Sequence, residues 1–404
     1  MSGDAAQVCV PFWFSPGKHP SFDLASTAFP SILGATSLSE ACPLNDATRV
    51  TRAGLPAAAQ GEPFLPGPTF AGTYHLSGDP ASAAYTYGRY GNPTWTGYEN
   101  AITELEGGAA TVVFSSGMAA ISATLGTTLK AGDVLVMPSD AYSSARLLAS
   151  GYFAGLGVEV RLAPTAGNAQ QAHLQGARLL WIESPSNPGL EVADIALLAE
   201  AAHAAGALVA VDSTTPTCLG QQALALGADF SFSSDTKATT GHSDLILGHV
   251  AVRDAAWADK LHAWRRQMGS VPGPMEVWLA HRSLATLHLR LERQCNNALA
   301  IAGFLASRAE VRGLRYPGLP GDPAHPIASR QMKFCGPVLC FSLASQEQAE
   351  RFLQHCELVF EATSFGGIHT TAERRARGFS GSLHPPLRQR SVRSPSSCTG
   401  SWRE

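Results

Sequence analysis

Apolar and polar residues alternate in blocks from about residue 95 to residue 252. Short runs of consecutive apolar residues predict strands that are buried on both faces, and the segments between them have the spacing of amphipathic helices. The predicted strands are 111–114, 133–137, 158–162, 178–183, 207–212, 229–233 and 249–252, and the predicted helices are 95–106, 118–129, 142–156 and 195–205. This pattern indicates an α/β fold whose mostly parallel sheet is flanked by helices.

A second, smaller α/β unit is predicted further along the chain. A long helical pattern runs from 274 to 306 and precedes several short elements. These are strands near 311–316, 338–343 and 358–362, with a helix at 346–356. We therefore expect a large domain at 105–290 and a small C-terminal domain at 291–377, with the boundary inside or beside the long helix.

Three stretches lack this regularity. Residues 1–47 show no sustained period, which predicts a loosely ordered extension. Residues 48–104 begin with a segment rich in Gly, Pro and Thr, so we expect an arm rather than a packed layer. Residues 378–404 combine Ser, Pro and Arg without periodicity, which predicts a disordered tail.

Composition limits the class of protein. The chain has 404 residues, 45% of them hydrophobic and 15% charged, which is typical of a globular protein of more than one domain. Its formal net charge of −3 lacks the basic excess expected of a nucleic-acid-binding protein. The apolar runs are too short for a membrane span. A signal peptide has basic residues before its apolar region, and the apolar stretch at 8–14 has none before it.

The cysteines are scattered along the chain without a CxxC pair. Their low density argues against a disulfide framework, and matching metal ligands are not evident around Cys335 and Cys340. We therefore expect reduced thiols, no metal site and a cytoplasmic protein.

Candidate chemistry starts at Lys237, which follows the predicted strand 229–233 in the run Ser-Phe-Ser-Ser-Asp-Thr-Lys. A lysine at the carboxyl end of a buried strand can form a Schiff base with an aldehyde cofactor, because desolvation lowers its pKa toward nucleophilic use. A solvated or ion-paired lysine is the alternative that this pattern leaves open.

Two further candidates follow strand ends. Asp212 ends the predicted strand 207–212, and doubly wound sheets bind ligands at the carboxyl ends of strands. A carboxylate there can keep a pyridine nitrogen protonated, so that pyridoxal phosphate acts as an electron sink. An N-capping Asp is the alternative. Tyr142 either stacks on a cofactor ring or packs half-buried in the core.

A turn of small residues at 115–118 (Ser-Ser-Gly-Met) lies between a predicted strand and a predicted helix. Backbone N–H groups and the positive end of the helix dipole make such a turn suited to phosphate, and Gly117 permits close approach. Ser234 and Thr236 can add hydroxyl donors to the same phosphate.

Several short motifs occur in a specific order. They are Tyr-Gly-Arg-Tyr-Gly-Asn-Pro-Thr (87–94), Leu-Glu-Gly-Gly (105–108), Ser-Ser-Gly-Met (115–118), Glu-Ser-Pro-Ser-Asn-Pro (183–188), Val-Asp-Ser-Thr (211–214), Ser-Ser-Asp-Thr-Lys (233–237), Gly-His-Ser-Asp (241–244) and Ser-Phe-Gly-Gly (364–367). This order resembles the Cys/Met-metabolism family of pyridoxal-phosphate enzymes, which includes cystathionine γ-lyase, cystathionine γ-synthase and methionine γ-lyase. The resemblance covers about 48–377.

The resemblance implies a fold type I architecture and the family's cofactor, pyridoxal 5′-phosphate (PLP). It implies that Lys237 holds the cofactor and shuttles protons, that Asp212 pairs with the pyridinium nitrogen, and that Tyr142 stacks on the ring and acts as a possible acid or base. It also implies that four residues bind the cofactor phosphate: Gly117, Met118, Ser234 and Thr236. Tyr87 and Arg89 are implied to reach the phosphate site of the neighbouring subunit. Asn187, Ser364 and Tyr87 are implied to contact the substrate, and Asn187 also to lie near the cofactor.

The resemblance also implies a homo-oligomer, a dimer usually assembled into a tetramer, that acts on a sulfur amino acid. The stretch Thr-Ser-Phe-Gly-Gly-Ile-His-Thr-Thr-Ala-Glu-Arg-Arg at 363–375 most resembles bacterial cystathionine γ-lyases, and this resemblance favours γ-elimination of cystathionine to cysteine, 2-oxobutyrate and ammonia. γ-Replacement on an acylated homoserine and γ-elimination of methionine stay open, although Ser144 stands where methionine γ-lyases typically carry a cysteine.

The similarity fades after Arg377. The family's closing strand, with the arginine that binds the substrate carboxylate, is not evident there, and Arg388 and Arg390 lie near the expected distance without its pattern. We expect a changed reading frame or a truncated terminus, so a catalytically impaired homologue is a third hypothesis.

Overall fold

The structure, a computed structural model, describes residues 44–374. The tail expected at 378–404, which contains Arg388 and Arg390, lies outside the described residues, as does most of the extension expected at 1–47. The short helix α1 (Asp46–Arg52) begins inside that extension, because the Asn45 side chain accepts a hydrogen bond from the Thr48 amide at 2.9 Å and caps the helix.

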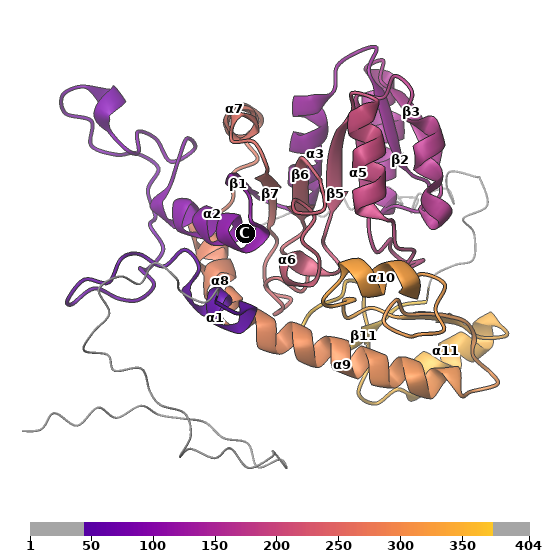
Figure 1. Ribbon diagram of the computed structural model, residues 1–404. Coiled ribbons are helices and arrows are strands. Elements are labelled where there is room, and N and C mark those ends of the chain that lie inside the picture. Colours follow the sequence, from indigo (N-terminus) through magenta and orange to yellow (C-terminus); the bar gives the residue numbers. More distant parts are fainter. Residues whose placement is uncertain (1–43, 375–404) are drawn as a thin grey trace, which may run out of the picture. The chain divides into compact units, whose positions relative to one another are not determined.

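A mostly parallel sheet of seven strands forms the centre of the described chain, as the sequence predicts (Figure 1). The strand order is β1-β7-β6-β5-β4-β2-β3, and β7 runs antiparallel to both of its neighbours. The strands are β1 (Ala110–Phe114), β2 (Val134–Pro138), β3 (Glu159–Ala163), β4 (Leu179–Glu183), β5 (Leu208–Asp212), β6 (Phe230–Ser233) and β7 (Gly248–Val252). Each of the seven strands predicted for this sheet is therefore present, with ends that differ by no more than one residue.

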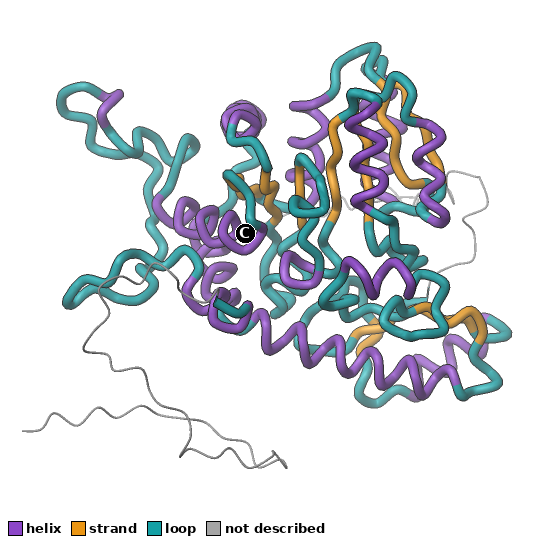
Figure 2. The backbone as a smooth tube through the Cα atoms, viewed as in Figure 1, coloured by secondary structure: helices purple, strands orange, loops and turns teal. Residues whose placement is uncertain are grey.

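Helices precede the sheet, lie in most of the connections between its strands and follow it along the chain; Figure 2 shows them in purple. They are α2 (Pro93–Glu106), α3 (Gly117–Thr128), α4 (Ser143–Leu147), α5 (Ile195–Ala204), α6 (Thr217–Gly220), α7 (Ala256–Met268), α8 (Pro274–Leu284) and α9 (Leu287–Ala306). Shorter helical turns occur at Pro80–Ser82, Leu148–Phe153 and Ala166–His173.

Alternate residues of the strands enter two separate hydrophobic clusters. Leu135 and Trp181 join the cluster that includes residues of α3 and α7, whereas Val136 joins the cluster that includes residues of α5. This period of two is what a strand buried on both faces requires. In the first cluster the rings of Trp181 and Phe232 pack with centroids 4.2 Å apart, which ties β4 to β6 across β5.

Two expected helices are interrupted. The helix predicted at 142–156 passes from α4 into a wider helical turn at Leu148–Phe153. The helix predicted at 274–306 is two helices, which are separated at residues 285–286, and Ser283 O accepts side-chain hydrogen bonds beside this break. It accepts a hydrogen bond from the Arg290 guanidinium at 2.9 Å and from Thr286 Oγ1 at 3.2 Å.

The stretch between α1 and α2 has little regular structure, in keeping with the arm expected there. Within it, residues Thr73 and Tyr87 form an isolated antiparallel bridge. Phe64 and Phe70 project into solvent, with 90% and 69% of their surface exposed. Their apolar surface is therefore not covered by other residues of the described part, 44–374.

The remaining elements are short. Strands β8 (Arg312–Arg315) and β9 (Cys340–Ser342) pair antiparallel, and β10 (Phe360–Glu361) and β11 (Thr371–Ala372) pair parallel, with helices α10 (His325–Gln331) and α11 (Gln346–His355) between them. The division into domains at 105–290 and 291–377 stays a prediction. No helix within residues 44–374 is long and apolar enough to cross a membrane.

Gly248 provides a test of how tightly β7 packs on the start of α3. A Cβ at this position would lie 2.7 Å from Gly117 Cα, so Gly248→Ala forces backbone apart and should lower the free energy of unfolding by about 1–3 kcal/mol. The control is Gly303→Ala in α9, where a Cβ meets nothing within 4 Å and the free energy should stay level or rise by up to about 1 kcal/mol. Equal denaturant stabilities for the two variants would contradict this packing.

Candidate active site

Lys237 lies in the loop that connects β6 to β7. Backbone hydrogen bonds from Lys237 N to Ser234 O (3.1 Å) and from Gly241 N to Lys237 O (2.8 Å) close this loop. Thr236 fixes it to the chain just before β7, because its Oγ1 accepts a hydrogen bond from Leu247 N at 3.0 Å and donates one to Leu247 O at 3.2 Å. The Lys237 side chain therefore starts from a well-anchored backbone.

The amine of Lys237 meets a residue that lies far away in the sequence. Lys237 Nζ donates a hydrogen bond to Ser364 Oγ at 2.6 Å and lies 5.2 Å from the centroid of the Phe365 ring. The turn that carries Ser364 rests directly on the lysine loop, since a Cβ on Gly366 would lie 2.4 Å from Ala238 N. The structure thus brings two of the predicted site residues, Lys237 and Ser364, into contact.

Asp212 is the last residue of β5 and is buried, with 7% of its surface exposed. It does not cap a helix, because α6 begins five residues later and has Pro216 at its N-cap; instead Asp212 Oδ1 accepts a hydrogen bond from Thr214 N at 2.9 Å. Burial raises the pKa of Asp212 to about 6, against the opposing effect of the Thr214 hydrogen bonds. A nearby cation would favour its ionised form.

Glu183 is a residue that the sequence reasoning missed as a member of the site. It ends β4 opposite Asp212, and its two carboxylate oxygens accept hydrogen bonds from the backbone amides of Tyr142 (2.7 Å) and Asn187 (2.9 Å). Burial, and then the neighbouring negative charge of Asp212, hold the pKa of Glu183 well above its usual range. The rule that selected Asp212, a carboxylate at a strand end, selects Glu183 as well.

Through Glu183 the structure connects two predicted residues to the sheet edge. Tyr142 immediately precedes α4 and has 42% of its surface exposed, so it is not a core residue. Asn187 lies in the Ser-Pro-Ser-Asn-Pro turn after β4 and is partly buried. Both backbones are therefore positioned by the same carboxyl group.

The turn at 115–118 begins α3, as predicted, with Met118 packed against the core. Ser116 Oγ caps this helix by accepting a hydrogen bond from Ala119 N at 3.0 Å. Gly117 approaches Ser234 so closely that an added Cβ would lie 2.6 Å from Ser234 Cβ and 2.8 Å from its Oγ. A helix N-terminus, a bare backbone and a hydroxyl at one place suit a phosphate group.

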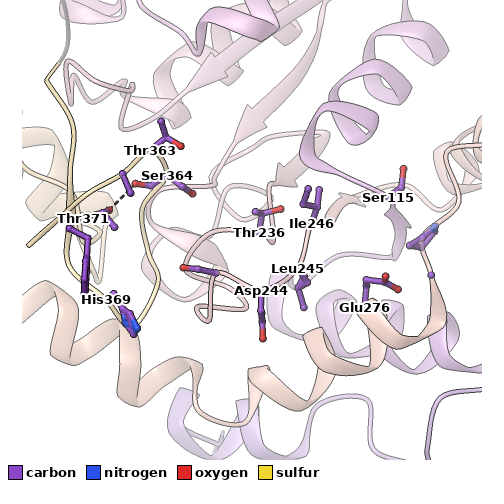
Figure 3. A pocket seen from close by; sticks show the side chains of 15 residues that line it. Ser115, Thr236, Asp244, Leu245, Ile246, Glu276, Thr363, Ser364, His369 and Thr371 are labelled. Atoms are coloured by element: carbon purple, nitrogen blue, oxygen red, sulfur yellow. Dashed lines mark hydrogen bonds between the residues drawn. The ribbon is translucent and has the colours of Figure 1, made fainter. Parts of the chain in front are cut away.

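A cavity of about 830 Å³ lies beside the lysine loop (Figure 3). Ser115 and Thr236 line it, together with Ser364 and His369 from the C-terminal part of the described chain. The cavity therefore extends from the turn at 115–118 to Ser364, the hydrogen-bond partner of Lys237. The residues predicted to contact the cofactor ring or the substrate, Asp212, Tyr142 and Asn187, lie outside its lining.

Tyr87 and Arg89 lie elsewhere, on the arm. The Arg89 guanidinium donates a hydrogen bond to Arg266 O at 2.6 Å and lies over the Tyr87 and Tyr90 rings at 5.6 and 5.0 Å. The structure therefore does not bring Tyr87 or Arg89 to Lys237 of the same chain. Their predicted role in a neighbouring subunit stays a prediction.

These groups are the ones that PLP needs: a lysine, a buried carboxylate for the ring nitrogen and a phosphate cradle that a Cβ would fill. No group of three or more His, Cys, Asp or Glu side chains in the described part of the chain is arranged to hold a metal ion.

Comparisons with known proteins support the same conclusion. A Streptomyces coelicolor protein, provisionally named cystathionine gamma-lyase, is 56% identical over 336 residues, which are 82% of this chain and 85% of that protein. Cystathionine gamma-lyase of Bacillus subtilis is 36% identical over 295 residues, 72% of this chain and 78% of that protein. The crystal structure of cystathionine gamma synthase from Xanthomonas oryzae pv. oryzae, in complex with aminoacrylate and cysteine, superposes with a TM-score of 0.77 at 35% identity, covering 81% of this chain and 86% of that one.

The sequence profile described as "Cys/Met metabolism PLP-dependent enzyme" matches residues 63–392. The fold type expected from the motifs, the family resemblance and the PLP cofactor are thereby confirmed. The chain belongs to the Cys/Met metabolism family and is a PLP-dependent enzyme.

Proposed function

We propose that this enzyme is a carbon–sulfur lyase that converts cystathionine and water to cysteine, 2-oxobutyrate and ammonia. The observation that carries the proposal is the contact between Lys237 Nζ and Ser364 Oγ at the margin of the cavity, which joins the predicted catalytic amine to the predicted substrate contact. The similar proteins from Streptomyces coelicolor and Bacillus subtilis carry the name cystathionine gamma-lyase, which supports this proposal.

PLP, when bound, supplies an aldehyde for the amine of Lys237 and an aromatic ring that accepts electrons. In the proposed reaction, Lys237 Nζ removes the proton from the α-carbon of the substrate. Ser364 Oγ, which accepts a hydrogen bond from this amine, keeps it directed toward the cavity. The phenol of Tyr142, at the start of α4, is proposed to protonate the departing sulfur atom.

The remaining residues hold the cofactor in this proposal. Asp212 keeps the ring nitrogen protonated, for which its burial and its place at a strand end are suited. Gly117 with Met118 at the N-terminus of α3, and Ser234 with Thr236 in the lysine loop, hold the phosphate.

A second candidate is γ-replacement on an acylated homoserine, in which cysteine takes the place of the leaving acyl group. The similarity to the Xanthomonas oryzae synthase structure favours this candidate, because the two folds superpose over most of both chains. In either case we propose a homotetramer in which Tyr87 and Arg89 of the arm contribute to the partner's site. The exposed Phe64 and Phe70 of that arm support an assembly that covers them.

The proposal is tested by incubating the PLP-loaded protein with cystathionine and measuring 2-oxobutyrate. We expect product from the natural chain, and a loss of at least about 100-fold in Lys237→Ala because the general base is removed. Lys260→Ala, an exposed lysine against Trp257 on α7, is the control and should retain activity. Cystathionine formed from acylated homoserine and cysteine, without 2-oxobutyrate from cystathionine, would select the replacement reaction instead.

Asp212→Asn tests the partner of the ring nitrogen. Because the pKa of Asp212 is about 6, its side chain is a carboxylate above that pH and a neutral acid below it. Above pH 6 the natural protein should therefore bind PLP more tightly than the variant, by about 2–5 kcal/mol. The advantage should shrink as the pH falls through 6, where neither side chain is charged. Equilibrium dialysis from pH 5 to 8 measures both; a constant ratio of affinities would exclude this pairing.

Glu183→Gln tests the positioning of Tyr142 and Asn187. A glutamine has one accepting oxygen in place of two, so one of the two backbone amides must lose its partner. We expect kcat to fall by about 10-fold or more, since misplacement of reacting groups by small distances is costly. Glu200→Gln on the exposed side of α5 serves as the matched control. Identical kcat values for the two variants would show that Glu183 does not position the site.

A further inference from the structure

A buried ionic cluster lies beneath the lysine loop. His249 of β7 stands between two carboxylates: its Nδ1 is 2.8 and 3.0 Å from the two oxygens of Asp235, and its Nε2 is 3.3 Å from Glu106 Oε1. Asp235 comes from the loop after β6 and Glu106 ends α2. All three are buried, with no more than 1% of their surface exposed.

This geometry determines the protonation of the imidazole. A neutral histidine has one N–H donor and one lone pair, so it would turn a lone pair toward one of the two carboxylates. Only the imidazolium donates in both directions. Burial alone would lower the pKa of His249, but the charges and hydrogen bonds of Asp235 and Glu106 prevail and raise this pKa to about 10.

Two other titratable groups face the cluster from the elements packed around it. Tyr98 of α2 and Cys218 of α6 face it, and burial, together with the nearby carboxylates, raises the pKa of each well above its usual range, so both are neutral. The Tyr98 hydroxyl interacts with Asp235, whereas Glu106 Oε2 has no hydrogen-bond partner among the described residues. Within the cluster, His249 is therefore the residue that carries the positive charge.

The cluster acts on the loop through Asp235, two residues before Lys237. The side chain of Asp235 is held by His249, while its carbonyl oxygen accepts hydrogen bonds from Thr240 N at 3.1 Å and Thr240 Oγ1 at 2.7 Å. The same residue thus ties the loop to β7 and closes the loop on itself. A buried ion cluster contributes less stability than apolar packing of the same volume would, which leaves the fixing of one loop geometry as the role to be tested.

We propose that His249, held as a cation between Asp235 and Glu106, is a positioning residue that locks the Lys237 loop onto β7 and so sets the orientation of the cofactor-binding amine. The inference rests on the proposed role of Lys237. Because the pKa of His249 is higher in the folded protein than the ordinary value of 6.5, the stability that the cluster contributes is complete below pH 6.5. It is then lost as the pH rises through about 10, which frees the loop.

The protonation of His249 is measured directly on the unaltered protein. NMR of the imidazole nitrogens, with the His249 signals assigned from their loss in His249→Gln, should show both N–H protons of His249 retained to above about pH 9. A His249 that loses a proton near pH 6.5, or that carries one proton at neutral pH, would overturn the proposal. This measurement does not depend on whether an altered cluster folds.

The positioning role is measured by the pH midpoint of the visible absorbance of bound PLP. His249→Gln and Asp235→Asn should each shift this midpoint by about one pH unit, a tenfold change in proton affinity. The double variant should shift it no further, because both changes remove the same interaction. His203→Gln is the matched control: His203 of α5 pairs with Asp229 at 2.9 Å in a similar histidine–carboxylate contact, away from the lysine loop.

The outcomes separate the two proposals. Midpoints that match that of His203→Gln would overturn the positioning role of His249. If Lys237→Ala has the same visible PLP absorbance as the natural protein, the assignment of Lys237 is overturned. The role proposed for its loop is then overturned as well, whatever the protonation of His249. A shared shift in both cluster variants, with the control unchanged, establishes the proposal.

Discussion

The register of β4, β5 and β6 is the constraint on which the rest of the structure depends. Glu183 pairs with Asp212, and Asp212 pairs with Phe232, so the three strands end side by side. Adjacent strands lie about 4.8 Å apart, which places two carboxylates and the start of the lysine loop within one small area. A shift of one residue would turn these side chains to the other face of the sheet and separate them.

Burial of like charges gives this edge its chemical character. Asp212 and Glu183 are both buried and adjacent, so their ionisation is costly unless a cation or a donor compensates it. The backbone amides of Tyr142 and Asn187 compensate Glu183 in part, whereas Asp212 is suited to a cationic ring nitrogen. In the cluster of Asp235, His249 and Glu106, buried carboxyl groups again lie close together. There the compensating cation is a side chain of the protein, His249. Perturbed ionisable groups of this kind gather at functional sites.

The sequence predicts the sheet well, because seven apolar runs with helical segments between them leave few alternative arrangements. It predicts the long helix at 274–306 less well. The break before α9 lies beside a hydrogen bond from Arg290 to Ser283 O, and a pattern of hydrophobicity does not record such a contact. It also misses α7 (Ala256–Met268), whose polar surface obscures its apolar stripe. The strand-end rule finds Asp212, but the link from Lys237 to Ser364 requires the fold, since 127 residues separate them. Likewise, the strand pairing of β6 with β7 decides that Asp235 meets His249.

The attachment point of the cofactor tests the account most directly. Borohydride reduction of the PLP-loaded protein fixes the cofactor on the lysine that holds it, and mass spectrometry of the peptides then identifies that lysine. The account predicts the label on Lys237, beyond the edge formed by Glu183 and Asp212, and on none of the lysines at 18, 130, 260 and 333. Stoichiometric label on one of those four positions, with Lys237 unmodified, would contradict it.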